Sequence, residues 1–283
     1  MSNKIKLAIP KGRLYDEVVK LLEDAGFQLS KNGRCYRPYI SDKEIEVKIM
    51  KPQNIPKLVE LGSQDIAFAG YDWIVEQDAD VEELIDLKFN PVKLVAAVPK
   101  GKAILKNKKI RVASEYEKIS KQFLEKEGLD YIFIKSFGAT EVFIPEDADM
   151  IIDNSSTGKT LQENGLVVFK ELLSSSTRLI ANKDSLKEQW KKKKIEDFLM
   201  LIKSILEGRK RYLIEMNVAE EKMEKLIPLL PCMKSPTIAK LYGNQGYAIK
   251  IAVEKEKVGK LIPFLKENGA TDILVFNLKK VIP

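Results

Sequence analysis

Along the first half of the chain, hydrophobic positions recur with two different periods, and segments with one period alternate with segments with the other. A period of two predicts a strand, and apolar positions three or four apart predict the buried side of a helix. Strands are expected at 4–10, 44–50, 65–70, 92–99, 108–114, 130–138 and 149–153. Helices are expected between them at 12–27, 71–77 and 115–128. This alternation is typical of open α/β sheets, which bind ligands beyond the ends of their strands.

The pattern changes in the second half of the chain. Strands at 166–173 and 177–184 and a long helix at roughly 185–207 come first. The following segments then read strand, helix, strand, strand, helix and strand: 211–218, 220–230, 236–243, 246–254, 255–269 and 272–278. That order is the βαββαβ order of a ferredoxin-like domain. The echo of "EKLIPLL" (224–230) in "GKLIPFL" (259–265) supports two similar half-units.

Composition narrows the class of protein. Of the 283 residues, 45% are hydrophobic, which is enough for more than one buried core. No apolar run approaches the ~20 residues that span a bilayer, and the first residues lack the features of a secretory signal. We therefore predict a soluble, cytoplasmic protein. The two cysteines, Cys35 and Cys232, are too few and too far apart for a zinc site or a disulfide framework.

Charge and the missing histidines limit the chemistry further. The chain has no histidine, which excludes a histidine general base and the commonest transition-metal ligand. Any metal should be a hard cation held by oxygen, and Mg²⁺ is the expected one beside phosphates. The formal charge of +7 fits nucleic acid, a membrane surface or small polyanions. The densest basic run, 191–194, is best interpreted as a solvated helix face, so neither nucleic acid nor a membrane is an expected partner.

The segment "DNSSTGKT" (153–160) carries the strongest chemical signal. It follows an apolar strand, and the polar sequence after it looks helical. Hydroxyl groups, a glycine and free backbone amides at such a junction suit a phosphate, and a carboxylate at the strand end suits a ribose. The expected phosphate-binding residues are Ser155, Ser156, Thr157, Gly158, Lys159 and Thr160, with Asp153 beside the sugar. A Walker A loop is excluded because it needs glycine where Asp153 stands; a simple helix cap remains the alternative interpretation.

Four further motifs follow predicted strands or turns. In "PKGRL", Lys11, Gly12 and Arg13 place positive charge at a helix start, where the helix dipole opposes it, so an anionic ligand is expected. The small residues of "DIAFAGYDW" leave room for a ligand next to Asp72. The other candidates come from "DIAFAGYDW", "RVASEY" and "FGATEVF": Gly70, Tyr116 and Glu141.

Taken in this order, the motifs resemble the ATP phosphoribosyltransferase family in its long form. The resemblance rests on "AIPKGRL", "DIAFAGYDW", "RVASEY", "GATEVF", "DNSSTGKTLQENGL" and, in the tail, "LLPCMKSPTI", "LYG" and "GATDILVFNLKKV". It implies two α/β lobes like those of periplasmic binding proteins and a C-terminal ferredoxin-like regulatory domain. The expected extents are 1–90 with 176–208 for lobe I, 91–175 for lobe II, and 209–283 for the regulatory domain.

The resemblance also implies the reaction. Phosphoribosyl pyrophosphate (PRPP) would donate its phosphoribosyl group to N1 of the adenine of ATP, with Mg²⁺, in the first step of histidine biosynthesis. Lys11 and Arg13 would then hold pyrophosphate or ATP phosphates, and Asp153 the ribose. Glu141 would help to hold the ribose or the metal, and Tyr116 would lie in the adenine region. Histidine would inhibit through the last domain, with Asn217, Ala270 and Thr271 as candidate contacts. The family forms homo-oligomers, namely dimers and hexamers.

Two other function classes stay open from the residues alone. A two-lobed protein that binds or senses a small ligand without catalysis would have the same lobes. A nucleic-acid-binding protein would share only the positive charge.

Overall fold

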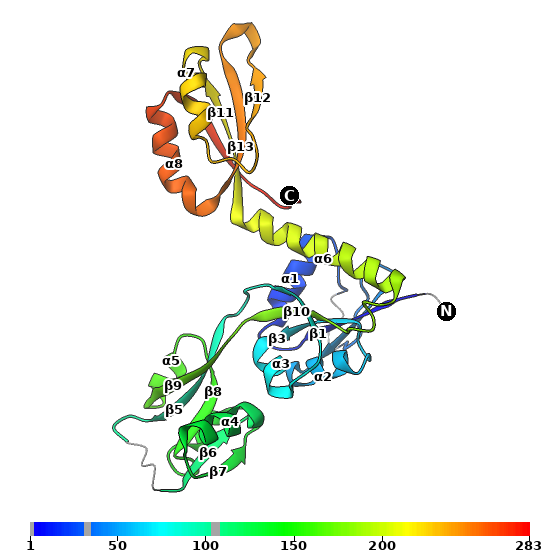
Figure 1. Cartoon of the computed structure of the whole chain (residues 1–283), viewed down its shortest axis with the longest axis vertical. Coiled ribbons are helices and arrows are strands. Elements are labelled where there is room, and N and C mark those ends of the chain that lie inside the picture. Colours follow the sequence, from blue (N-terminus) through cyan, green and yellow to red (C-terminus); the bar gives the residue numbers. More distant parts are fainter. Residues whose placement is uncertain (1–2, 31–34, 103–107) are drawn as a thin grey trace. The chain divides into compact units, whose positions relative to one another are not determined.

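The computed structural model describes residues 3–30, 35–102 and 108–283. The chain forms two compact units, of which one comprises residues 1–23 with 27–196 and the other residues 24–26 with 197–283. The first unit contains two five-stranded sheets, and the second contains one four-stranded sheet (Figure 1). Helix α6 (Gln189–Lys210) runs through the division, so the expected edge at residue 208 falls near its end.

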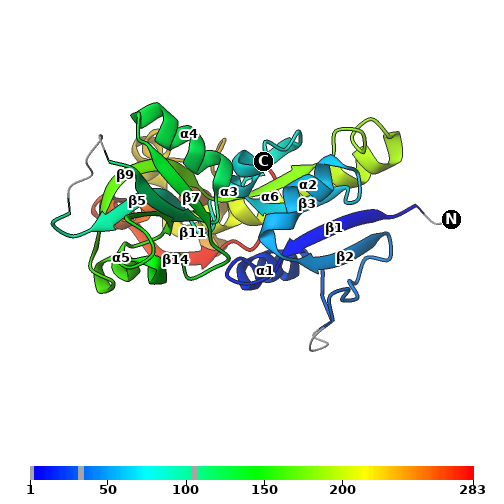
Figure 2. The same cartoon turned by 90° about the horizontal axis from the view of Figure 1, so that it is seen from below.

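The first sheet forms lobe I. Its strands lie in the order β2 (Ile45–Met50), β1 (Ile5–Pro10), β3 (Ile66–Gly70), β10 (Thr177–Ala181) and β4 (Glu82–Asp86). The first three are parallel, and β10 is antiparallel to both of its neighbours. Helix α1 (Tyr15–Ala25) covers one face, while α2 (Ile55–Glu60) and α3 (Tyr71–Gln77) cover the other (Figures 1 and 2). Because both faces are covered, β3 is buried along its whole length.

The second sheet forms lobe II and repeats this arrangement. Its order is β7 (Tyr131–Lys135), β6 (Ile110–Ser114), β8 (Met150–Ser155), β5 (Val92–Pro99) and β9 (Leu166–Ser175). Again three strands are parallel and the fourth is antiparallel to its neighbours. Helix α4 (Glu117–Glu127) packs on the sheet through buried Ile119, Phe123 and Leu124. The short helices of this lobe are η2 (Thr140–Phe143) and α5 (Lys159–Glu163).

The chain crosses between the lobes twice, and the first connection is hydrogen-bonded to Thr177, the residue that follows the second. The first connection joins β4 to β5, and the second is Ser176, between β9 and β10. The amide of Thr177 donates to the carbonyl of Phe89 at 3.1 Å, and the amide of Leu87 donates to the carbonyl of Thr177 at 3.0 Å. The connections therefore form one short paired segment rather than two independent loops.

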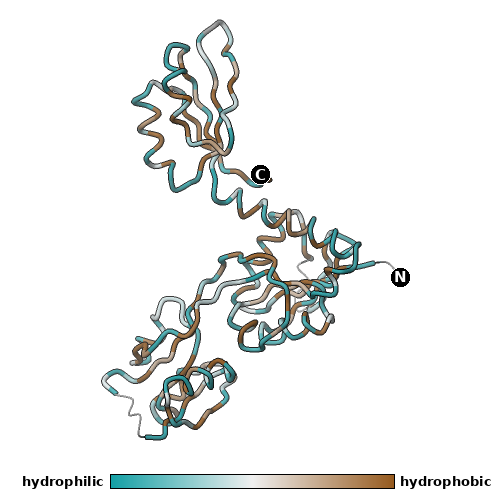
Figure 3. The backbone as a smooth tube through the Cα atoms, in the orientation of Figure 1, coloured by the Kyte–Doolittle hydropathy of each residue, from teal (hydrophilic) through white to brown (hydrophobic). Residues whose placement is uncertain are grey.

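The C-terminal sheet has the βαββαβ order that the sequence predicts. Its strands β11 (Arg211–Val218), β12 (Thr237–Lys240), β13 (Tyr247–Glu254) and β14 (Ala270–Asn277) lie in the order β12-β13-β11-β14. Helices α7 (Glu220–Leu226) and α8 (Lys255–Glu267) bury apolar residues against the sheet. Brown and teal residues alternate along α8 in Figure 3, as expected for a helix with one buried side. The predicted fold class, two α/β lobes and a ferredoxin-like domain, is confirmed.

Some elements differ from the prediction. Neither α2 nor β4 was expected, and the helix after the phosphate loop has only five residues. The predicted helix at 220–230 ends as a 3-10 turn, η3 (Ile227–Leu229), whereas its counterpart α8 stays helical past Pro263. Two further 3-10 turns are η1 (Pro52–Asn54) and η4 (Tyr242–Asn244). Within the described residues, no helix has the length and apolar content needed to span a bilayer.

Candidate active site

The candidate site residues of the first unit gather at one kind of position, the carboxyl end of a parallel strand. Lys11 follows β1, and Asp72 comes just after β3. Tyr116 follows β6, Glu141 follows β7, and the phosphate loop begins at the end of β8. Parallel strands of one sheet bring their carboxyl ends to the same edge. Each lobe therefore presents its candidate residues along one edge, which the sequence order alone would not place together.

Two adjacent cavities bring these edges together. One cavity, of about 270 Å³, contains Lys11, Gly70, Asp72 and Tyr116 in its wall. The other, of about 390 Å³, is lined by Glu141, Asp153 and all six residues of the phosphate loop, 155–160. Arg13, Glu115 and Asn154 line both cavities. A ligand in one cavity would therefore lie next to a ligand in the other.

The phosphate loop presents donors to its cavity. Gly158 has the left-handed φ of +76°, and its amide donates to the Ser155 hydroxyl at 3.1 Å. In the described part of the chain, the amides of Ser156 and Thr157 have no hydrogen-bond partner. These two amides, with nearby hydroxyls, are suited to an anion. The dipole of α5 contributes little to anion binding, because this helix is only five residues long. The donors come from the turn itself.

Lys159 differs from its neighbours in this loop. Its ammonium lies 3.6 Å from the carboxylate of Glu163, and its side chain is largely exposed. Thr157 accepts a long hydrogen bond of 3.4 Å from the Lys159 amide. The loop's hydroxyls and amides are therefore better placed for a phosphate than its lysine ammonium.

Asp153 occupies an unusual environment for a carboxylate. Burial, together with the nearby carboxylates of Glu141 and Glu115, raises the pKa of Asp153 to about 6. The amide of Asn154 donates to it at 2.7 Å and opposes that shift. A cation or an electron-poor sugar carbon next to this carboxylate would lower its pKa again. Asp153 is therefore poised to gain interaction energy from a positively charged neighbour.

The basic residues after β1 lack acidic partners. Neither Lys11 nor Arg13 forms an ion pair with any of the described residues. The Lys11 ammonium donates to the Tyr36 hydroxyl at 3.2 Å and lies 5.2 Å from the centre of that ring. Gly12 between them has a φ of +87° and open space where a side chain would point. Two unpaired cations on a cavity wall favour an anionic ligand.

Asp72 is the centre of a buried network across the two lobes. Its carboxylate accepts hydrogen bonds from the Tyr116 hydroxyl at 2.6 Å and from the Ser175 hydroxyl at 2.8 Å. The side-chain amide of Asn154 donates to the same tyrosine oxygen at 3.1 Å. Burial, followed by the charge of Asp72, raises the pKa of Tyr116, so this phenol stays protonated. Asp72 is thus held by donors and is not free to act as a base.

Gly70 has a structural reason to lack a side chain. A Cβ at this position would lie 2.3 Å from a carboxylate oxygen of Asp72. The space that we assigned to a ligand on sequence grounds is thus filled by Asp72 itself.

Beside Asp72, the rings of Trp73 and Tyr116 stack with centroids 4.5 Å apart, and both residues line the smaller cavity. This cavity therefore has an aromatic wall.

Several residues of the site were not singled out from the sequence. Gln53 donates to Glu115 at 3.2 Å across the lobes, and Asn154 joins the two cavities. Trp73 lies in a segment that reads as an ordinary amphipathic helix. The sequence feature that could have indicated Trp73 is its neighbour Asp72, because a polar residue after a buried strand marks the same turn as part of the site.

The three residues expected to contact histidine lie together in the second unit. Asn217 on β11 pairs with Thr271 on β14, and Ala270 pairs with Val218 in the next position of the register. Asp272, which the sequence did not single out, accepts hydrogen bonds from Asn217 at 2.9 Å and Thr271 at 3.1 Å. The Asn217 amide, followed by the Thr271 hydroxyl, lowers the pKa of Asp272. The cluster thus presents an exposed carboxylate.

Comparisons with known proteins agree with this geometry. The family model described as ATP phosphoribosyltransferase matches residues 51–204, and the model described as HisG, C-terminal domain, matches residues 208–280. The chain belongs to the ATP phosphoribosyltransferase family. The resemblance inferred from the motifs is confirmed, and the chain is a phosphoribosyltransferase.

Relatives of full length share the family's name. The ATP phosphoribosyltransferase of Pelotomaculum thermopropionicum is 38% identical over 288 residues, which cover 99% of this chain and 100% of that protein. That of Thermodesulfovibrio yellowstonii is 38% identical over 294 residues and covers both chains fully. A solved structure, the ATP phosphoribosyl transferase (HisG:HisZ) complex from Thermotoga maritima, is 28% identical with a TM-score of 0.65. That match covers 70% of this chain and 96% of the other.

Proposed function

We propose that the chain transfers the phosphoribosyl group of PRPP to N1 of the adenine of ATP, releasing pyrophosphate, in histidine biosynthesis. The observation that carries this proposal is the pair of cavities that share Arg13, Glu115 and Asn154. One has the donor-rich turn of a phosphate site, and the other has an aromatic wall. Two substrates bound there would meet at the shared residues.

The reaction suits a site without histidine. Adenine N1 carries a lone pair, so no base has to create the nucleophile. The enzyme must instead bring two polyanions together and stabilise charge as pyrophosphate leaves, which is a matter of positioning and electrostatics. We assign the 5′-phosphate of PRPP to the turn at 155–158 and the leaving pyrophosphate to Arg13 and Lys11. The lack of acidic partners for these two cations supports the assignment.

We assign the adenine of ATP to the smaller cavity, where it would lie against Trp73, whose ring is backed by the buried ring of Tyr116. A planar base gains stacking energy on aromatic rings. We assign Asp153 to the ribose of PRPP, where its carboxylate would face the positive charge that develops at the anomeric carbon. Its raised pKa supports this, because a carboxylate short of cationic partners gains most from that charge.

The acidic residues of the larger cavity could supply some, but not all, of the ligands of a Mg²⁺ ion. In the described parts of the chain, no three acidic or thiol side chains converge on a possible metal position. Mg²⁺ commonly needs only one or two carboxylates when substrate phosphates supply other ligands. Glu141 and Glu115 line the cavity and would supply those oxygens. The ion would neutralise charge on the pyrophosphate group.

We further propose that histidine inhibits the enzyme by binding where β11 ends and β14 begins. The Asp272 carboxylate, held by Asn217 and Thr271, would accept the ammonium group of the amino acid. Homo-oligomers, as dimers and hexamers, are proposed from the family alone. An Asp272→Asn variant that keeps wild-type sensitivity to histidine would overturn this site.

The proposed reaction has a direct test. Purified protein is incubated with ATP, PRPP and Mg²⁺, and phosphoribosyl-ATP and pyrophosphate are measured by mass spectrometry and a coupled pyrophosphate assay. Formation of both in equal amounts supports the proposal, and GTP in place of ATP is the control. A folded protein that binds a small solute tightly, without product and without competition from either substrate, would instead be the non-catalytic binding protein.

A further inference from the structure

We propose that Glu76, on helix α3 of lobe I, is a positioning residue for this reaction because it caps helix α4 of lobe II and thereby fixes Tyr116. The part of this inference that concerns the role of Tyr116 rests on the proposed function. The cap itself is a contact between two elements of the first unit and does not depend on that function.

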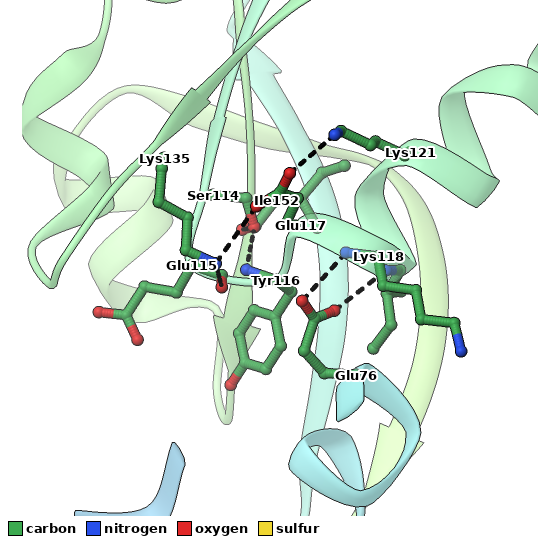
Figure 4. A network of polar contacts seen from close by, with 10 residues as sticks. Glu76, Ser114, Glu115, Tyr116, Glu117, Lys118, Lys121, Lys135 and Ile152 are labelled. Atoms are coloured by element: carbon green, nitrogen blue, oxygen red, sulfur yellow. Dashed lines mark hydrogen bonds and ion pairs between the residues drawn. The ribbon is translucent and has the colours of Figure 1, made fainter. Parts of the chain in front are cut away.

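The cap is a two-pronged hydrogen bond. One oxygen of the Glu76 carboxylate accepts from the amide of Lys118 and the other from the amide of Ile119, each at 3.0 Å. These amides belong to the first turn of α4, where no intrahelical acceptor exists. Figure 4 shows the carboxylate facing the start of α4 from the helix below. A cap usually comes from the residue that begins the helix, but Tyr116 makes no such bond, so α4 takes its cap from the other lobe.

Tyr116 is the residue that this cap controls. It is the N-cap position of α4, directly before the turn that Glu76 holds. Its ring stacks on Trp73, three residues before Glu76 on the same helix, and its hydroxyl bonds to Asp72. An ion pair between Lys118 and Asp78, at 2.8 Å, also joins these two helices. Helix α3 thus sets the backbone and the side chain of Tyr116 through separate contacts.

Charge makes the contact specific. A carboxylate at a helix N-terminus is favoured by the helix dipole, and its bonds to two amides are charge-assisted. A glutamine at position 76 would keep one acceptor and would point an amide donor at the second N–H. Three other carboxylates near this turn have different partners: Glu117 pairs with Lys121 at 2.7 Å, Asp78 with Lys118, and Glu115 accepts from Gln53. Glu76 alone of these four accepts from the α4 amides.

The test compares Glu76→Ala and Glu76→Gln with Glu117→Gln in the full chain. Glu117→Gln also removes one negative charge beside the first turn of α4, but Glu117 pairs with Lys121 and Lys135 rather than with the capped amides. The first readout is kcat and KM for ATP and PRPP. The second is the emission of Trp73 and its quenching by acrylamide, in a Trp190→Phe background that leaves Trp73 as the sole tryptophan. Thermal unfolding sets an assay temperature at which every variant is folded.

We expect Glu76→Ala to lower kcat/KM for ATP by about tenfold or more, since small misplacements of contact groups are costly. Glu76→Gln should lie between it and the wild type, KM for PRPP should change less than KM for ATP, and Trp73 emission should shift. Glu117→Gln should stay within about twofold. Wild-type kinetics and unchanged emission in Glu76→Gln would overturn the proposal.

The two readouts separate this inference from the proposed function. If the wild type makes no phosphoribosyl-ATP, the reaction is wrong, yet a shifted Trp73 emission in Glu76→Gln still supports the cap. If the wild type is active and the emission is unchanged, the cap does not position Tyr116. If Glu76→Ala does not fold, the isosteric Glu76→Gln variant tests the proposal on its own.

Discussion

The hydroxyl of Tyr116 donates a 2.6 Å hydrogen bond to the carboxylate of Asp72, and the two residues belong to different lobes. Tyr116 is 1% exposed and Asp72 6% exposed, so water does not compete for this bond. The bond therefore contributes both to the stability of the first unit and to the alignment of the two cavity walls.

Tyr116→Phe should lower the free energy of unfolding by about 1.5 to 3 kcal/mol, because the buried carboxylate of Asp72 loses one of its two side-chain donors. Urea denaturation followed by circular dichroism measures the change. Tyr131→Phe is the matched control, since its hydroxyl makes only a 3.4 Å surface contact with Glu125; about 0.5 kcal/mol or less is expected there. Equal effects of the two variants would contradict the importance of the Asp72 bond.

Asp153→Asn should stabilise the folded protein near neutral pH while reducing product formation. The pKa of Asp153 is about 6 in the folded protein, above its ordinary value of 3.8. The folded state therefore binds this proton more tightly than the unfolded state. Its ionised form destabilises the fold by at most about 3 kcal/mol, a penalty that is absent below about pH 4 and complete above about pH 6.

Urea unfolding between pH 4 and 8 tests the sign of this effect. The advantage of Asp153→Asn should be largest above pH 6 and should vanish as the pH falls towards 4. Asp130→Asn, at an exposed position, is the control and should show no such trend. An Asp153→Asn curve parallel to that of the wild type at every pH would refute the raised pKa, and near wild-type activity would refute the role in catalysis.

Arg13→Gln should lower kcat/KM by about 30-fold, the loss expected for one charged hydrogen bond to an anion. Because Arg13 lines both cavities, we expect the apparent affinity for both substrates to fall. Lys20→Gln removes a charge from an exposed position of α1 that lines neither cavity. Initial rates of phosphoribosyl-ATP formation measure both variants, and a similar loss in each would indicate only a general effect of charge.

Gly70→Ala should destabilise the protein by about 1 to 3 kcal/mol, as overpacking of a buried site does. The backbone at Gly70 has an ordinary φ of −70°, so the cost comes from the added methyl group against Asp72 rather than from backbone strain. Gly259→Ala provides the contrast. It lies within α8 with open space around it, so alanine should stabilise the protein by up to about 1 kcal/mol. Thermal and urea unfolding compare the two.

The fold was accessible from the sequence where periodicity and burial agree. Strand β5 begins and ends where its apolar run does, and β13 alternates as a half-buried strand should. Strand β4, with the sequence EELID, was missed because it is acidic and at a sheet edge, and pairing with β10 decides its conformation. Helix α2 was missed because six residues that include Pro56 carry no clear period.

The site was accessible only in part, for a related reason. Asp153 and the turn after it could be predicted because their residue types stand out directly after an apolar strand. Glu76 and Gln53 do not, because their partners lie 42 or more positions away and belong to another lobe. Local sequence can indicate a loop's chemistry, whereas a cap supplied by a distant helix is visible only in three dimensions.

The hydrogen bonds that join Phe89, Leu87 and Thr177 restrict how the two lobes can move. A movement that slid one crossing along the other would break these bonds. Ser175, just before Thr177, holds Asp72. The Asp72–Tyr116 bond and the Glu76 cap also join the lobes, so any movement that separates the lobes would have to break them as well.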